Sequence, residues 1–148
     1  MAVLHIVSAL CLLAACNAIY LTRHTDCGGH GTVHSILLEP CNHEPCDIHL
    51  GQTYTARINF TANENSHTAT NKCKGEIAGS WVDFPVTPSN ACGTGITCPI
   101  HKGETYTYTA SVTCPTDAPS VRMVGQWSVL DDRGQNMICF NFPLQIVK

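Results

Sequence analysis

Cysteine is the residue type with the most potential chemistry in this chain, which contains 10 Cys among 148 residues. Eight of them follow the apolar N-terminal stretch, namely Cys27, Cys41, Cys46, Cys73, Cys92, Cys98, Cys114 and Cys139. An even number of cysteines in a secreted chain predicts a disulfide framework. Cys41 and Cys46 flank a short turn-prone loop, as do Cys92 and Cys98, so we expect a local bond within each pair. A bond between Cys27 and Cys139 would close a long loop, worth roughly 4–5 kcal/mol of stability.

Zinc binding is the alternative chemistry for the same residues, because His43, His49 and His101 lie close to cysteines in the sequence. The spacings are not of the C-x₂-C type, and an oxidising compartment favours disulfides over metal ligation. The sequence lacks the G-x-S-x-G and H-E-x-x-H motifs and a phosphate-binding loop. Asp131 and Asp132 lie in a predicted turn, where we expect water to solvate both carboxylates. We therefore expect no catalytic site, no metal site and no cofactor.

Residues 1–18 are predicted to be a signal peptide that is not part of the fold. The apolar run from Ala2 to Ala15 is shorter than the roughly 20 residues of a membrane span, and small residues suit cleavage after Ala18. The segment is atypical, because His5 stands in place of Lys or Arg, and residues 13–16 also resemble a bacterial lipobox. No second long apolar run follows, so we expect residues 19–148 to form one secreted, monomeric domain.

Alternation of apolar and polar residues dominates the rest of the chain and predicts β-strands. The clearest segments are residues 53–61, 106–112, 121–129 and 138–146, with shorter candidates at 33–38, 73–78 and 81–86. Asp131–Gly134 is predicted to be the hairpin turn between the last two long strands. No segment has a helical stripe of apolar residues. About seven strands with regular turns predict an all-β, immunoglobulin-like β-sandwich of two antiparallel sheets.

Charge and composition limit the function of this predicted sandwich. Charged residues make up 13% of the chain and the net charge is −3, without a Lys/Arg stripe, so we expect no nucleic-acid partner. The inward faces combine large aromatic residues with Ala and Gly. Small inward residues either interdigitate with large ones or leave space, and the sequence alone does not decide between the two. Asn59 starts an N-x-[ST] glycosylation sequon and is one of the polar residues in the alternating pattern of its predicted strand. A glycan on Asn59 would therefore face water.

Several motifs together resemble the MD-2-related lipid-recognition (ML) domain family, most closely its Niemann-Pick C type 2-like sterol carriers, which are related to the group 2 mite allergens. The resemblance extends from about His24 to Val147. The residues that carry it are Asp26-Cys27-Gly28, Pro40-Cys41, Pro45-Cys46, Gly51-Gln52-Thr53-Tyr54, Phe84-Pro85, Cys92, Gly95-Ile96-Thr97-Cys98-Pro99-Ile100, Lys102, Thr105-Tyr106-Thr107-Tyr108, Pro119-Ser120, Trp127, Asp131-Asp132 and Pro143-Leu144-Gln145-Ile146-Val147.

This resemblance implies a sandwich whose sheets are splayed to hold one lipid between them. It implies the disulfides Cys27–Cys139, Cys41–Cys46 and Cys92–Cys98, in agreement with the spacing. It also implies a ligand-binding pocket lined by Tyr54, Ala56, Ile58, Cys73, Ile77, Val82, Phe84, Tyr108, Val112, Cys114, Ala118, Val121, Met123, Trp127, Phe140, Phe142 and Leu144.

The sequence departs from the family pattern at four positions in or near this pocket. Cys73 and Cys114 replace aliphatic residues, and their inward parity predicts a fourth disulfide between them, which a peptide map showing two free thiols would refute. Ala118 replaces an aromatic residue and Gly125 a branched aliphatic one, and both changes would widen the pocket. Strict selectivity for cholesterol is therefore not expected.

The sequence thus predicts a secreted carrier of a sterol, a fatty acid or a similar lipid, which could also be delivered to lysosomes and touch a membrane during transfer. The alternative is a secreted lipid-sensing recognition protein, such as an innate immune or chemosensory co-receptor. Protonation of histidines could loosen loops at acidic pH and aid delivery, although scattered surface histidines are the simpler interpretation.

Overall fold

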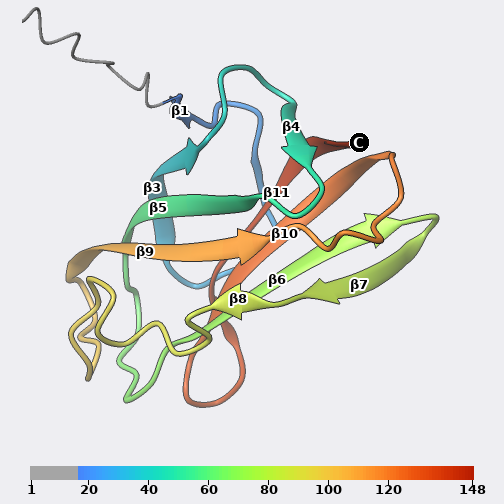
Figure 1. Cartoon of the computed structure of the whole chain (residues 1–148). Helices are drawn as coiled ribbons and strands as arrows, with labels where there is room; N and C mark the ends of the chain where they lie inside the picture. Colours follow the sequence, from blue (N-terminus) through green and yellow to red (C-terminus); the bar gives the residue numbers. More distant parts are fainter. Residues whose placement is uncertain (1–16) are drawn as a thin grey trace, which may run out of the picture.

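The computed structural model describes residues 17–148, which form eleven β-strands and no helix (Figure 1). The predicted signal peptide lies, apart from its last two residues, outside the described residues. Among residues 17–148 no helix is long and apolar enough to cross a membrane.

The first sheet has five strands in the order β1-β3-β5-β9-β8, all paired antiparallel. The strands are β1 (Ile19–Tyr20), β3 (Thr32–Glu39), β5 (Thr53–Thr61), β8 (Val86–Thr87) and β9 (Thr105–Thr113). On the inner face of β5, residues Tyr54, Ala56, Ile58 and Phe60 are all buried. The sequence alternation is therefore confirmed as a division between a buried and a solvent-facing side.

The outer face of β5 and β9 carries a ladder of hydroxyl pairs. Thr53 Oγ1 lies 2.7 Å from Thr113 Oγ1, and Thr55 Oγ1 lies 2.9 Å from Ser111 Oγ. Such cross-strand pairs add to the stability of a sheet and fix its register. Asn59 belongs to this ladder, since its Nδ2 donates to Thr107 Oγ1 at 2.7 Å. Its side chain is on the outer face, and its glycosylation stays a prediction.

The second sheet has six strands, with the path β2-β11-β10-β6-β7 and β4 paired to β11. The strands are β2 (Thr25–Asp26), β4 (Cys46–His49), β6 (Thr70–Ile77), β7 (Ser80–Phe84), β10 (Arg122–Leu130) and β11 (Asn136–Val147). The pairs are antiparallel except that β4 runs parallel to β11. The all-β sandwich is confirmed, while the short strands β1, β2 and β4 were not predicted.

One predicted strand, residues 81–86, is divided between the two sheets. β7 ends at Phe84 and pairs with β6, whereas β8 begins at Val86 and pairs with β9. Pro85 lies between them, and its missing N–H makes it a natural interruption of a strand. The chain therefore crosses between the sheets here, which places Phe84 at one edge of the sandwich.

Three disulfides link the ends and loops of the sandwich: Cys27–Cys139, Cys41–Cys46 and Cys92–Cys98. These three predicted pairings are confirmed. The predicted Cys73–Cys114 bond is wrong, because both residues are buried free cysteines. Cys73 lies on β6 of the second sheet and packs in the main core, whereas Cys114 follows β9 of the first sheet and packs in a separate small cluster with Met123 and Ile146.

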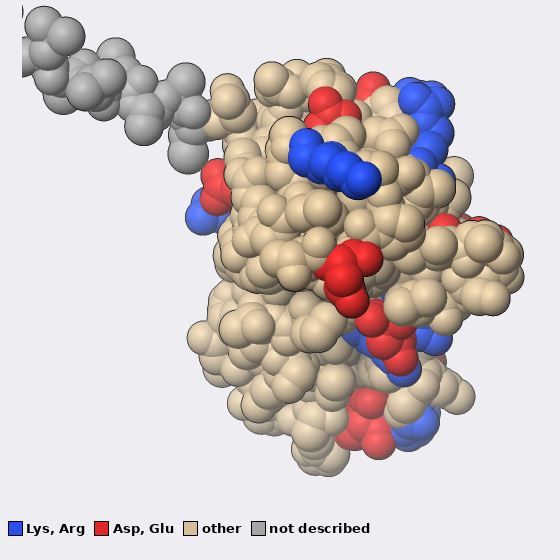
Figure 2. Space-filling model, turned by 45° about the vertical axis from the view of Figure 1, so that its right-hand side comes forward, with Lys and Arg blue, Asp and Glu red and all other residues tan. Residues whose placement is uncertain are grey.

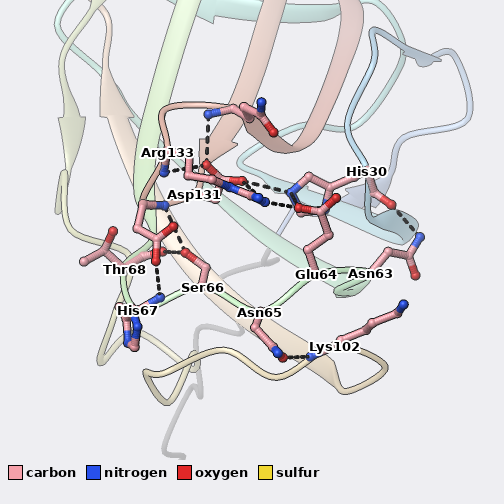
Figure 3. A network of polar contacts seen from close by, with 12 residues as sticks. His30, Asn63, Glu64, Asn65, Ser66, His67, Thr68, Lys102, Asp131 and Arg133 are labelled. Carbon is pink, nitrogen blue, oxygen red and sulfur yellow. Dashed lines mark hydrogen bonds and ion pairs between the residues drawn. The ribbon is translucent and has the colours of Figure 1, made fainter.

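A polar network ties the β10–β11 hairpin to the loop after β5 (Figure 3). Asp131 lies at its centre with a fully buried side chain, and its Oδ1 accepts hydrogen bonds from the backbone N–H groups of Arg133 and Gln135 at 2.8 and 2.9 Å. The ring of His30 lies 3.2 Å from Asp131 Oδ2. The expectation that Asp131 is solvated is therefore wrong, because the turn folds its own amides around the carboxylate.

Burial alone would raise the pKa of Asp131, but the amides of Gln135 and Arg133, with His30, outweigh it and hold the pKa below its usual value. A carboxyl with a depressed folded pKa stabilises the fold above its unfolded pKa of about 4, and this stability is lost as pH falls through the folded pKa.

We expect Asp131→Asn to lower the free energy of unfolding by about 1–3 kcal/mol at pH 7, because the amide presents donors to His30 and Arg133. The deficit relative to the wild type should shrink as pH falls below the unfolded pKa of about 4, because the unfolded wild-type chain then binds a proton that the folded Asp131 takes up only at lower pH. Urea unfolding of both proteins at pH 7 and at pH 3 measures this. Asp117→Asn, at an exposed residue, is the matched control. An equal loss at both pH values would contradict the assignment.

Candidate functional site

A partly open apolar cavity of about 80 Å³ lies between the two sheets. Its walls come from both sheets and are almost entirely apolar, and such cavities stay dry unless an apolar molecule fills them. The residues that line it are Leu21, Ile36, Leu38, Ile48, Tyr54, Ala56, Cys73, Lys74, Phe84, Val112, Cys114, Met123, Gly125, Trp127, Phe140, Phe142, Leu144 and Ile146.

Most residues of the predicted pocket contact this cavity. They are Tyr54, Ala56, Cys73, Phe84, Val112, Cys114, Met123, Trp127, Phe140, Phe142 and Leu144. Sequence reasoning missed Leu21, Ile36, Leu38, Ile48, Lys74 and Ile146, whereas Gly125 was expected to widen the pocket and does line it. The alternating pattern places Ile36, Leu38 and Ile146 on the inward faces of their predicted strands, so the sequence could have indicated these three residues. No such signal existed for Leu21, which lies outside every predicted strand.

Six predicted residues do not contact the cavity. Ile58 and Tyr108 are fully buried in the main core. Ile77 and Ala118 pack instead against the small cluster around Met123, Val82 is 44% exposed on the edge strand β7, and Val121 precedes β10. Inward parity alone therefore does not separate cavity walls from solid core or from the rim.

A buried hydrogen bond between the sheets limits the cavity on one side. Trp127 of β10 lines the cavity, and its Nε1–H donates to Tyr108 Oη of β9 at 2.8 Å. Burial raises the pKa of Tyr108, so its hydroxyl stays protonated and neutral. Tyr108 also meets Phe60 edge to face, with ring centroids 5.9 Å apart. The ring of Tyr108 therefore fills the space between the sheets next to Trp127, and the cavity does not extend there.

Tyr54 forms an amphipathic part of the wall. Its ring lines the apolar cavity, while its Oη accepts a hydrogen bond from His49 N at 2.8 Å and lies 3.1 Å from Gln52 Oε1. Burial raises the pKa of this phenol as well. A second hollow of about 270 Å³ lies at Tyr54 and is lined by polar groups that include His43 and Asp47. It is larger but more open and more polar, so the apolar cavity is the candidate site for an apolar ligand.

Two glycines that pair across β6 and β10 leave space on the inner face of the sheet for the cavity side chains. Gly75 pairs with Gly125, so no side chain rises from the sheet at this place. A Cβ at Gly125 would lie 2.8 Å from Phe142 Cζ, and one at Gly75 would overlap the end of Met123. The side chains of Phe142 and Met123 therefore rest in the space of the missing Cβ atoms.

Neither the thiols nor the polar network forms a catalytic arrangement among the described residues. Burial raises the pKa of Cys73 to about 12 and also raises the pKa of Cys114, so both are thiols at neutral pH. His30, Glu64 and Asp131 place ligand atoms within 4.8 Å of one another. The guanidinium of Arg133 already pairs with both of those carboxylates, which leaves little negative charge for a metal ion.

The surface gives no sign of a polyanion-binding face on the side drawn in Figure 2. Lys and Arg are few there and lie apart, with Asp and Glu between them. The apolar residues with the largest exposed fractions include Trp81 and Val82, each 44% exposed, next to each other on edge strand β7.

Comparison with known proteins shows which family this chain resembles. A family model described as the ML domain matches residues 22–146. The NPC intracellular cholesterol transporter 2 of Mus musculus is 35% identical over 138 residues, covering 93% of this chain and 92% of that protein. A Niemann-Pick type C2 protein from Japanese carpenter ant has the same fold, with a TM-score of 0.74 at 22% identity over 83% of this chain and 98% of that one. Chicken MD-1, solved with lipid IVa, has a TM-score of 0.58 at 16% identity over 87% of this chain and 90% of that one.

We expect Tyr108→Phe to lower the free energy of unfolding by about 1–3 kcal/mol, because it leaves the buried indole N–H of Trp127 without an acceptor. Tyr106→Phe is the matched control on the same strand, since its hydroxyl bonds to the exposed groups His101 N and Glu104 Oε2 and water can replace it. Urea unfolding with the disulfides intact compares the two variants. A smaller loss for Tyr108→Phe than for Tyr106→Phe would show that the bond between the sheets contributes little.

Proposed function

The chain belongs to the ML domain family, and from that premise we propose that it is a secreted lipid carrier without enzymatic activity. The family predicted from the sequence motifs is thereby confirmed. The proposed cargo is a sterol, a fatty acid or a similar apolar molecule held between the two sheets. The observation that carries the proposal is the cavity between the two sheets, whose walls are apolar and come from both sheets.

The driving force for binding is the removal of apolar ligand surface from water, worth roughly 25 cal/mol per Å². A ligand that buries about 300 Å² would gain about 7 kcal/mol before the entropic costs of association. Lys74 is the only charged residue among the cavity-lining residues. Binding therefore depends on shape and apolar area, which suits a carrier that must also release its ligand.

The cavity must expand to take such a ligand. Its volume of about 80 Å³ is smaller than the roughly 150 Å³ of an engineered apolar cavity that binds benzene, and a sterol is much larger. The side chains of Phe84, Met123 and Phe142 line it and can change rotamer. We propose that the ligand displaces these side chains and that the sheets separate further at the edge near Phe84.

Delivery requires passage of an apolar ligand between the cavity and a membrane or a membrane protein. Trp81 and Val82 are exposed on β7, which ends at the cavity residue Phe84. Tryptophan favours the interface between water and lipid. These two residues support a transient membrane contact during transfer.

Lipid-dependent recognition by a receptor is the alternative function, since the chicken MD-1 structure with the same fold contains lipid IVa. Transfer of dehydroergosterol and of a fluorescent fatty acid between vesicles tests the carrier directly. Protein that accelerates transfer catalytically supports the carrier. Protein that binds lipid but transfers none, and forms a stable complex with a receptor ectodomain, would overturn it in favour of recognition.

We expect Gly125→Val to weaken binding of these fluorescent lipids at least about tenfold, because the new side chain pushes Phe142 and Leu144 into the cavity. The displaced atoms are side-chain ends, so the protein should still fold. Gln126→Val is the matched control, since it introduces the same residue on the outer face of the same strand. Fluorescence titration gives both affinities, and equal affinities would place the ligand outside the cavity.

A further inference from the structure

The only free cysteines among the described residues both line the ligand cavity. Cys73 is 8% exposed and Cys114 is 5% exposed, and the other six cysteines of this part of the chain form disulfides. The Cys73 thiol makes no hydrogen bond with another described residue, and the Cys114 thiol has only a weak contact of 3.7 Å with Pro115 O. Two nucleophilic sulfur atoms therefore lie in the walls that an apolar ligand would touch.

The apolar walls determine which reagents can reach these thiols. A charged or strongly hydrated electrophile would lose its hydration on entering, whereas an apolar one gains from the same burial that binds a lipid. A molecule held in the cavity meets the sulfur at a high effective concentration. The cavity thus selects electrophiles by the length and apolarity of their carbon chain.

We propose that the cavity captures apolar α,β-unsaturated carbonyl compounds, such as long-chain enals, as thioether adducts on Cys114. The inference rests on the proposed lipid-binding function and adds covalent retention to it. The sulfur forms a bond to the β-carbon, the C=C π electrons move toward the carbonyl, and the α-carbon takes up the proton that the thiol gives up. No oxidant, reductant or leaving group is needed.

Cys114 is the better placed of the two thiols for this reaction. It follows the end of β9 next to the loop of residues 115–121, whereas Cys73 lies in the middle of β6 between β7 and β10. Burial raises the pKa of Cys114, but the Gly51 amide opposes this effect, and no such group assists Cys73. Because the thiolate is the nucleophile, the addition should accelerate with rising pH and occur first at Cys114.

The test uses the folded protein with its disulfides intact and the homologous trans-2-enals from hexenal to decenal. Intact-mass kinetics give the rate of adduct formation, which is divided by the rate of each enal with glutathione to remove intrinsic reactivity. Each added methylene that becomes buried should favour binding about fourfold, so the normalised rate should rise more than about tenfold along the series. Peptide mapping should place the first adduct on Cys114.

Two cysteine variants provide matched controls. Cys114→Ser should remove the fast adduct, whereas in Cys73→Ser peptide mapping should still place the first adduct on Cys114. A normalised rate independent of chain length, or first adducts on histidine or lysine, would overturn the proposal.

Binding of decanoic acid, measured by native mass spectrometry, separates this proposal from the carrier function. Decanoic acid that binds, together with enals that form no thioether, would overturn only the covalent capture. If decanoic acid does not bind either, the proposed carrier function fails as well.

Discussion

The hydrogen bond from Trp127 to Tyr108 joins the two sheets behind the cavity, and the position of this bond determines where the sandwich is solid and where it is hollow. On the Tyr108 side, Ile58 and Phe60 are fully buried and the sheets pack without space. On the other side, Phe84 and Phe142 lie against the paired glycines of β6 and β10. A sandwich without this polar contact could slide and close, since apolar packing alone is not directional.

The hollow half costs stability, which the solid half and the covalent links must offset. At about 24 cal/mol per Å³, an unfilled cavity of about 80 Å³ costs about 2 kcal/mol. The Cys27–Cys139 bond spans 112 residues and constrains the unfolded chain by roughly 4–5 kcal/mol. The buried Asp131 carboxylate fixes the hairpin at the end of β10 that is remote from the cavity. The protein therefore concentrates its constraints away from the residues that a ligand must move.

Alternation in residues 53–61 and 106–112 was enough to predict these two strands and their buried faces, because a sheet with one solvent-facing side requires apolar residues at every second position. The set of predicted pocket residues came from the resemblance to the ML family. The alternating pattern could not show that Tyr54 lines the cavity while Tyr108 belongs to the solid core. Both side chains point inward, and only their depth and hydrogen-bond partners differ. The two-residue strands β1 and β2 were unpredictable because contacts distant in sequence hold them. The Cys73–Cys114 prediction failed for a similar reason: inward parity brings two side chains to one cavity without bringing their sulfur atoms together.

The burial of these two thiols also bears on how the chain reaches its native disulfides. Eight cysteines allow roughly 100 complete pairings, and more when two of them stay free, and exchange between pairings needs an accessible thiolate. Partly folded molecules expose such groups and can continue to reshuffle. In the folded protein both free thiols are buried, and burial raises the pKa of each, so both are protonated at neutral pH. Closure of the two sheets around these thiols is therefore expected to slow their exchange with the three disulfides.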